Sequence, residues 1–428
     1  MKDPNQKRPG YKKTTAGWIP IEWECIRLGS VFTNRKKKGS KGLPVLSVTM
    51  DRGVILRSAI ERKMATAVPS DESLLVEPGD LAYNMMRMWQ GAVGVCSTSG
   101  VISPAYVVCR PLKTRADAWY MYHLFKSHPG RHWLTSYSYG IHEDRLRLYY
   151  DDFALVPIPL PPLSEQRKIA AILSSWDAAI SQTRDLIEAA KRRKRALMQQ
   201  LLSGNVRLPG FGDGGRDAGR KTHGTTGGRL PEGWRRLHLH EMARLEYGRD
   251  WASVADPAGA FPVYGTGGII GRASEPLAHG PTLIIGRKGS IAQPQMVESS
   301  FWAVDTTFYL VPQVAFSVGW LHALLCLSGL GHLSEGSGVP SLSRNTLDSV
   351  RLPTPPLPEQ RAIAAVLSTA DDEIRALEAK TAALERQKKG LMQKLLTGEV
   401  RVTQDARHRT HAPWVVRLAS HPTKETPP

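Results

Sequence analysis

The sequence predicts a mixed α/β (α+β) fold with two domains of irregular, twisted sheets, joined and separated by two long helices. These helices are expected to pair as an antiparallel coiled coil with pseudo-twofold symmetry. Three observations support this prediction: a repeated segment, a heptad pattern inside the repeat, and short apolar runs broken by Gly and Pro upstream of each copy.

The repeat consists of two well-matched stretches and a weaker entry sequence. PPLSEQRKIAAILS at 161–174 returns as PPLPEQRAIAAVLS at 355–368, and LMQQLLSGNVR at 197–207 returns as LMQKLLTGEVR at 391–401. Upstream, IPIEW ends at Trp23 and LPEGW ends at Trp234. A period this long is too long for a solenoid, so the chain contains two copies of one domain-plus-helix unit. Between the anchors the halves diverge, which indicates one scaffold carrying two different faces.

Each matched segment predicts a long helix, because apolar residues alternate at spacings of four and three. Lys194 and Lys388 are polar exceptions in the same register, and Gly204 and Gly398 stand where helix C-caps are expected. At 1.5 Å per residue, ~40 residues give a helix of about 60 Å. A single amphipathic helix packed on its own domain is the alternative. The predicted helix-pairing positions are Ile169, Leu173, Ile180, Leu197, Leu201, Ile363, Leu367, Ile374, Leu391 and Leu395.

The predicted organisation has seven segments. They are a disordered basic arm at 1–16, a first domain at 17–160, a first long helix at 161–205, a Gly-rich linker at 206–228, a second domain at 229–354, a second long helix at 355–402 and a flexible tail at 403–428. Strands are expected at 43–49, 74–83 and 101–109 in the first domain and at 281–286 and 301–311 in the second, with a helix at 116–126.

Composition points to a polyanionic partner. The 428 residues carry a net charge of +18 with 41% hydrophobic residues, so the chain is both globular and strongly basic. A basic protein without such a partner is the alternative. The four cysteines show no metal or CxxC spacing, which favours a reducing cytoplasm. No apolar run approaches the roughly 18 residues of a membrane helix, and no signal peptide is evident.

No catalytic residue, metal ligand set or bound cofactor is predicted. No stretch matches the phosphate-binding pattern G-x-x-x-x-G-K-[ST]. The run YGTGGIIGR at 264–272 nearly matches G-x-G-x-x-G, but Ile270 replaces the last glycine, so a tight turn between strands is expected. Asp256-Pro257-Ala258-Gly259 is similar to the start of an adenine-methyltransferase cofactor loop, yet no catalytic tetrapeptide follows. The pair Asp371-Asp372 lies on a predicted helix and is expected to face solvent.

Binding chemistry remains. Basic, amide and hydroxyl side chains gather in loops of both halves beside aromatic and glycine residues. Such groups can contact phosphates and base edges, although each alone is also typical of a solvated surface. The candidates are Arg35, Lys36, Asn84, Arg87, Gln90, Tyr139 and His142 in the first half, and Arg249, Thr266, Arg287, Lys288, Ser290, Arg344 and Asn345 in the second.

The two PPL-x-EQR segments, the L-L-[ST]-G-x-V-R helix ends and the paired Trp entries resemble the specificity subunit of type I restriction–modification systems over nearly the whole chain. The resemblance implies two target-recognition domains, each reading one half of a bipartite, asymmetric sequence in double-stranded DNA. It also implies helices that set the spacing and dock two modification subunits. The resemblance does not identify any residue of this chain as a base contact.

The family's partners imply the cofactors. The modification subunits carry S-adenosylmethionine and methylate adenine, and the added restriction subunits use ATP and Mg²⁺ for endonuclease activity. The chain itself is then non-catalytic. The alternatives are a stand-alone DNA-binding regulator and a methyltransferase with its own recognition domain.

Overall fold

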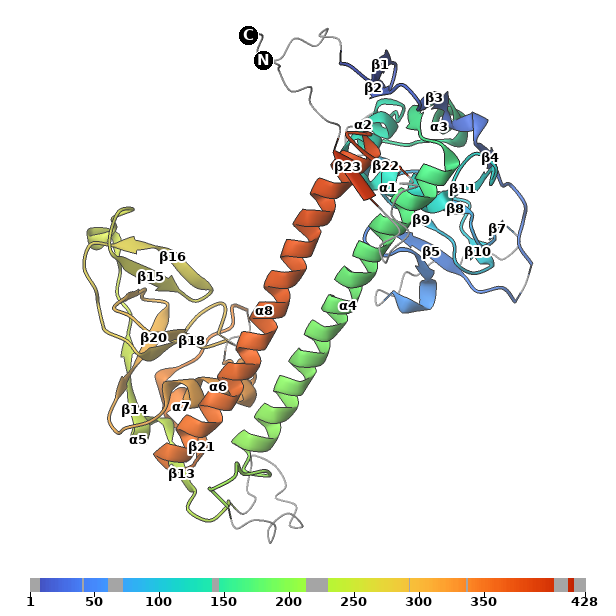
Figure 1. Ribbon diagram of the computed structural model, residues 1–428. Helices are drawn as coiled ribbons and strands as arrows, with labels where there is room; N and C mark the ends of the chain where they lie inside the picture. Colours follow the sequence, from blue (N-terminus) through green and yellow to red (C-terminus); the bar gives the residue numbers. More distant parts are fainter. Residues whose placement is uncertain are drawn as a thin grey trace. The chain divides into compact units, whose positions relative to one another are not determined.

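The computed structural model describes residues 8–40, 42–60, 72–140, 146–212, 230–291, 293–335, 338–403 and 415–418. The chain divides into two compact units. The first unit holds Met1–Gln182 and Thr381–Pro428, and the second unit holds Thr183–Lys380. Each unit therefore combines one sheet-containing domain with a segment of each long helix (Figure 1).

The first unit is built on a four-stranded antiparallel sheet in the order β4-β11-β8-β9. Its helices α1, α2 and α3 and the fully buried side chains of Trp23, Tyr83 and Phe153 contribute to one core. Its strands are β1 (Tyr11–Thr14), β2 (Gly17–Pro20), β3 (Glu24–Arg27), β4 (Phe32–Asn34), β5 (Leu46–Thr49), β6 (Gly53–Leu56), β7 (Leu74–Val76), β8 (Leu81–Asn84), β9 (Val93–Val95), β10 (Gly100–Ile102), β11 (Tyr106–Pro111), β12 (Pro157–Leu160), β22 (Val400–Thr403) and β23 (Val415–Leu418), and its helices are α1 (Ala118–Lys126), α2 (His128–Ser136) and α3 (Tyr150–Leu155).

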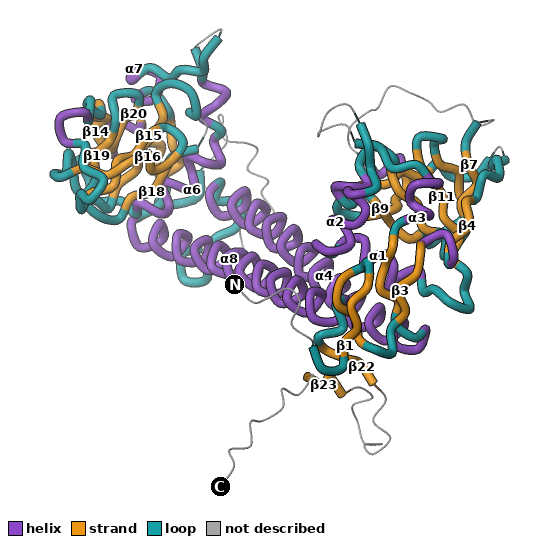
Figure 2. The backbone as a smooth tube through the Cα atoms, turned by 90° about the horizontal axis from the view of Figure 1, so that it is seen from above, coloured by secondary structure: helices purple, strands orange, loops and turns teal. Residues whose placement is uncertain are grey.

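The second unit repeats this plan with a sheet in the order β14-β20-β17-β18 and a smaller sheet in the order β16-β15-β19. Helix α6 packs against β17 and β18 (Figure 2). Its strands are β13 (Arg235–His238), β14 (Ala243–Tyr247), β15 (Phe261–Gly265), β16 (Gly268–Ala273), β17 (Thr282–Gly286), β18 (Gln295–Val297), β19 (Trp302–Ala303), β20 (Thr307–Pro312) and β21 (Arg351–Thr354), and its helices are α5 (Leu239–Met242), α6 (Val318–Ser328) and α7 (Arg344–Asp348).

Helices α4 (Leu163–Leu202) and α8 (Leu357–Leu396) are the two predicted long helices. They run antiparallel, because the residue numbers of the partners on α8 decrease as the residue numbers on α4 increase. In the second unit Lys191 Nζ lies 3.0 Å from Glu378 Oε1, and Lys194 Nζ lies 2.5 Å from Asp371 Oδ1. The helices lie side by side in Figures 1 and 2. The predicted pairing positions are buried except for Leu197 and Leu391, which are half-buried.

Both helices begin after a proline pair and end beside the glycines where the sequence placed their C-caps. The N–H of Gln166 donates to the carbonyl oxygen of Pro162 at 3.0 Å, and Gln360 does the same to Pro356 at 3.0 Å. Gly204 and Gly398 follow the helix ends with φ of 74° and 72°, the left-handed region that favours glycine. Because Gly398 stops the second helix, β22 occupies residues that were predicted to be helical up to 402.

Five other expectations were wrong in detail. The described part of the predicted disordered arm contains β1, which pairs with β2 and is anchored by Tyr11 Oη donating to the carbonyl oxygen of Gly398 at 3.0 Å. The predicted strand at 74–83 is two strands, β7 and β8, because residues between them turn around the buried Asp80. The runs at 101–109 and 301–311 are likewise each divided between two strands. The predicted tail contains β23.

The polar positions of the helix pair are ion pairs at equivalent places. Lys194 meets Asp371 in the second unit, and Lys388 contacts Asp177 in the first. The side chains of Asp371 and Asp372 are 44% and 63% exposed, so the pair faces solvent as expected, but Asp371 also has a partner on the other long helix. Each lysine in the largely apolar seam therefore has a carboxylate partner on the opposite helix.

His123 on α1 lies against the ion pair of Lys388 and Asp177 in the first unit. Its side chain is buried, with Nε2 at 3.1 Å from Ser174 Oγ and Nδ1 at 3.8 Å from Asp177 Oδ2. Burial, followed by the charge of Lys388, lowers the pKa of His123 to about 3. The folded first unit therefore holds this imidazole neutral at neutral pH.

We expect the stability of the first unit to fall when the pH is lowered from about 7 to about 5. The unfolded chain binds the His123 proton near pH 6.5, whereas the folded chain binds it only near pH 3. The contribution of neutral His123 to the free energy of unfolding is therefore fully present above pH 6.5 and is lost as the pH falls from 6.5 towards 3. One such group contributes up to about 1.4 kcal/mol per pH unit. Urea unfolding of the wild type and of His123→Gln, measured at both pH values, should show a flatter dependence in the variant. Equal slopes would contradict the assignment.

No helix within the described ranges is both long enough and apolar enough to cross a membrane.

Candidate nucleic-acid interface

In both units the same two segments meet at one edge of the four-stranded sheet. One segment follows β8 in the first unit and β17 in the second. The other segment precedes the short helix α3 in the first unit and α7 in the second. The N–H of Leu148 donates to the carbonyl oxygen of Met85 at 2.9 Å, and the N–H of Leu342 donates to that of Arg287 at 2.9 Å. We call these two edges the first and second loop edges. They hold most of the predicted binding residues, although the loop sequences differ almost completely.

The second loop edge carries two adjacent cations, Arg287 and Lys288. The Arg287 guanidinium lies 5.4 Å from the ring centroid of Tyr247, and its Nη1 donates to the carbonyl oxygen of Asp305 at 3.1 Å. Lys288 is exposed, and within the described part of the chain no carboxylate lies within ion-pairing distance of it. Its backbone forms a bridge with Ser341. These contacts engage the Arg287 guanidinium, whereas the Lys288 ammonium has no carboxylate partner among the described residues and can meet an anion.

Other predicted residues of the second half surround this loop. Thr266 lies beside the turn at Gly289, where a Cβ would stand 3.7 Å from Thr266 Oγ1. Ser290 and Asn345 are exposed. Arg249 is also exposed, and its carbonyl oxygen accepts a 3.0 Å hydrogen bond from Trp302 Nε1. Arg344 is half-buried, with Nε 3.6 Å from Asp348 Oδ2. The structure thus brings Arg287, Lys288, Ser290 and Thr266 together and places Arg344 and Asn345 at the start of α7 beside them.

The first loop edge carries fewer cations and more aromatic surface. Arg87 is exposed in the loop after β8, while Asn84 caps that loop by accepting from the N–H of Met86 at 2.9 Å. Gln90 is half-buried in the same loop. Tyr139 is exposed, and its ring centroid lies 5.9 Å from that of Tyr149.

Sequence reasoning missed two residues of this edge. Arg147 is exposed, pairs with Tyr139 through backbone hydrogen bonds, and donates from Nη1 to Tyr149 Oη at 3.3 Å. Arg147 is eight residues from Tyr139 in the sequence, and the backbone hydrogen bonds of the folded chain bring the two together. The prediction for His142 lies outside the described residues.

Arg35 has a different role from the one the sequence suggested. Its side chain is 9% exposed; Nε lies 2.7 Å from Asp80 Oδ2 and Nη2 lies 2.8 Å from Glu77 Oε2. These contacts occupy the guanidinium and hold the turn between β7 and β8. The neighbouring Lys36 is exposed.

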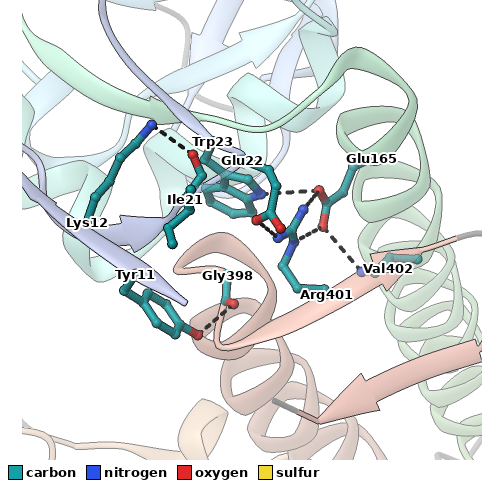
Figure 3. A network of polar contacts seen from close by, with 9 residues as sticks. All are labelled: Tyr11, Lys12, Ile21, Glu22, Trp23, Glu165, Gly398, Arg401 and Val402. Atoms are coloured by element: carbon teal, nitrogen blue, oxygen red, sulfur yellow. Dashed lines mark hydrogen bonds and ion pairs between the residues drawn. The ribbon is translucent and has the colours of Figure 1, made fainter. Parts of the chain in front are cut away.

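In the first unit, a buried carboxylate on α4 ties the domain to β22, the strand that follows α8 (Figure 3). Glu165, near the start of α4, accepts from Arg401 Nε at 2.8 Å and Nη2 at 2.9 Å, and from Trp23 Nε1 at 3.2 Å. The N–H of Val402 adds a fourth bond at 3.3 Å. Hydrogen bonding to Glu165 raises the pKa of Arg401. Arg401 Nη1 also reaches Glu22 Oε2 at 2.7 Å. We call this group the first clamp.

The second unit contains the equivalent second clamp. Glu359 accepts from Arg207 Nε at 2.9 Å and Nη2 at 2.7 Å, and from Trp234 Nε1 at 3.0 Å. The repeated E-Q-R and V-R letters were recognised in the sequence but received no role. The repetition itself was the signal that could have revealed these pairs. Glu165 and Arg207 of the first copy correspond to Glu359 and Arg401 of the second.

The adjacent glutamines join the domains to the scaffold in the same way. Gln166 Oε1 accepts from the N–H of Asp117, the N-cap of α1, at 2.9 Å. Gln360 Oε1 accepts from the N–H of Ser317, the N-cap of α6, at 2.9 Å. Each loop edge is therefore presented by a sheet and helix that are hydrogen-bonded to the start of a long helix.

Within the described ranges, no group of three His, Cys, Asp or Glu side chains is arranged to hold a metal ion. The four cysteines are free thiols, and burial raises the pKa of Cys96 to about 12. A thiol with so high a pKa stays protonated and is a poor nucleophile. The described surface offers cations, amides and aromatic rings, which suit binding.

A duplicated scaffold that presents two unlike, basic loop edges defines a two-domain nucleic-acid-binding protein. Its two repeats match the family model described as the type I restriction modification DNA specificity domain, at residues 20–192 and 231–386. The chain belongs to this family, and it is the DNA specificity subunit of a type I restriction–modification system.

Curated relatives share this organisation over nearly their full length. A putative type I restriction enzyme MjaX specificity subunit from Methanocaldococcus jannaschii is 21% identical, covering 92% of this chain and 98% of the relative. The type I restriction enzyme MjaVIII specificity subunit of the same organism is 22% identical, covering 92% and 97%.

Two solved structures have the same fold. The type I restriction–modification S subunit from M. genitalium is 16% identical with a TM-score of 0.58, covering 92% of this chain and 99% of that one. A chain from a structure concerning complex assembly and conformational transition of the type I R-M system is 21% identical with a TM-score of 0.55, covering 89% and 99%. These likenesses agree with the predicted mixed α/β architecture and long helix pair.

Proposed function

We propose that each loop edge reads one half of a bipartite, asymmetric target in double-stranded DNA. The observation that carries this is the equivalence of the two edges: one scaffold places unlike side chains at the same position twice. Identical faces would read identical half-sites, whereas an aromatic first edge and a basic second edge would read different ones. The net charge of +18 favours binding to the phosphate backbone in both halves.

We further propose that this chain is non-catalytic and works in the cytoplasm with partner subunits. Two modification subunits would dock on the helix pair and supply S-adenosylmethionine for adenine methylation. Restriction subunits would add ATP- and Mg²⁺-dependent cleavage. The helix pair would set the distance between half-sites. The family membership and the free thiols of the described chain support this assignment.

The proposal predicts that damage to one loop edge affects one half-site. Replacing Arg287 and Lys288 by Ala in the assembled complex should reduce discrimination in the half-site read by the second domain, by about 1–3 kcal/mol for a lost bidentate contact. Arg87→Ala should act in the same way on the other half-site. The target would first be identified from methylated adenines in the source genome, and binding would then be measured against all single-base variants.

Arg244→Ala is the matched control. Arg244 is exposed, lies near the far end of β14 from Tyr247, and pairs with Glu246 at 2.9 Å. The Arg244→Ala substitution removes one positive charge from the second domain without changing the second loop edge. Loss of discrimination in both half-sites, or in neither, would contradict the proposed division of the target.

A further inference from the structure

Three aliphatic side chains of the second unit are unusually exposed. The exposed fractions are 67% for Val339, 62% for Ile269 and 54% for Ile270. Single exposed aliphatic residues are ordinary, but several gathered on neighbouring loops mark a contact surface.

The two isoleucines are exposed because the β15–β16 hairpin is irregular. Its register shifts between Val263 and Tyr264, so that Val263 faces Gly271 and Tyr264 faces Ile269. Ile270 is left unpaired and lies over Gly265, where a Cβ would stand 3.1 Å from Ile270 Cγ2. Regular alternation would bury one of two successive residues. The bulge turns both outward, beside a turn that contains Gly267 and Gly268.

This hairpin belongs to the same surface as the second loop edge. Gly289 lies next to Thr266 in the hairpin turn, and its N–H donates to the carbonyl oxygen of Pro340 at 2.8 Å, beside Val339. Gln295 Nε2 also donates to the carbonyl oxygen of Gly265 at 2.8 Å. One turn at Gly289 therefore joins the exposed hairpin and the Val339 segment, and it directly follows Arg287 and Lys288.

An apolar element beside Arg287 and Lys288, which have no carboxylate partner among the described residues, suits DNA, because the cations match phosphates while the apolar side chains need apolar groups. The thymine methyl is the apolar group on the base edges of the major groove, and a two-stranded ribbon fits that groove. We propose that Ile269 and Ile270, with Val339 beside them, contact thymine methyl groups in the half-site that the second domain reads. This inference rests on the proposed function and adds the chemistry of recognition to it.

The test removes only the methyl groups. Assembled complex would be titrated with target duplexes in which each thymine of one half-site is replaced by deoxyuridine. Burial of one methyl group corresponds to about a fourfold change in affinity. The wild type should lose about this factor at one or more positions of the second half-site. Ile269→Ser combined with Ile270→Ser should bind the normal target more weakly and lose nothing further with deoxyuridine at those positions.

Val314→Ser is the matched control. Val314 is 47% exposed and follows the end of β20 opposite to the one near Arg287. This variant should keep the full sensitivity to deoxyuridine, and the isoleucine variant should respond normally to deoxyuridine in the first half-site. Thermal unfolding of each variant checks that the surface substitutions leave the fold intact.

Two results would overturn the inference while leaving the proposed function standing. One is sequence-specific binding whose affinity does not fall when deoxyuridine replaces thymine in the second half-site. A second half-site that contains no thymine would count as the same result. The other is an isoleucine variant that remains as sensitive as the wild type. Failure of the complex to discriminate any sequence would instead overturn the proposed function.

Discussion

A chain truncated after Leu208 is expected to form a symmetric dimer and to redirect methylation to a palindrome. In the first unit, Asp177 meets Lys388 and Glu165 meets Arg401. The truncated chain lacks those cations but holds their repeat equivalents, Lys194 and Arg207. A second copy can supply them, and a closed twofold dimer presents the same face twice.

The measurement combines mass with target mapping. Residues 1–208 would be expressed with the cognate modification subunit, the assembly weighed, and the methylated adenines located. Glu165→Ala in the truncated chain is the control, because both clamps of the dimer would depend on that residue. A folded monomer, or a dimer that still methylates the asymmetric target, would show that the two halves are not interchangeable.

Glu165→Ala in the full chain is expected to destabilise the first unit by about 3–5 kcal/mol, the usual cost of removing one partner of a buried ion pair. The side chains of Glu165 and Arg401 are 6% and 22% exposed. Without the carboxylate, the guanidinium stays half-buried and Trp23 Nε1 loses its acceptor. Urea unfolding followed by tryptophan fluorescence measures the loss, and faster hydrogen exchange at the Val402 amide locates it.

Glu188→Ala is the control on the same helix. The Glu188 side chain is 60% exposed and lies 3.9 Å from Lys191, a separation typical of weak surface pairs. A change of less than about 0.5 kcal/mol is expected. If both substitutions have similar effects, the first clamp does not hold the unit together.

The scaffold was predictable from the sequence because its signals are local and repeated. The heptad spacing located α4 and α8, and the glycines at 204 and 398 located their ends. Partners distant in the chain were not predictable. The pairing of Asp371 with Lys194 had no local signal, because the two residues are 177 positions apart.

The candidate site was predictable only as a set of loops. Arg35 belongs to a basic run and looks exposed in sequence, but Asp80 neutralises it from 45 residues away. The meeting of Thr266 with Gly289 depends on strand register, which short irregular strands specify weakly. The run 264–272 was expected to form a tight turn between strands, which the β15–β16 hairpin confirms. Ile269 and Ile270 lie in β16, and their exposure follows from a bulge that the sequence pattern does not indicate.

The division of the chain into units also has a consequence for synthesis. The second unit is one continuous stretch, whereas the first unit requires residues from both ends of the chain. A ribosome adding roughly 5–20 residues per second needs about 10–40 s to make the ~200 residues between them. Throughout that interval the emerged amino-terminal half presents Trp23 and Glu165 without Arg401. Nascent chains on neighbouring ribosomes of one message display the same unfilled position. The last-made strand, β22, can therefore pair with the amino-terminal half of another copy instead of its own.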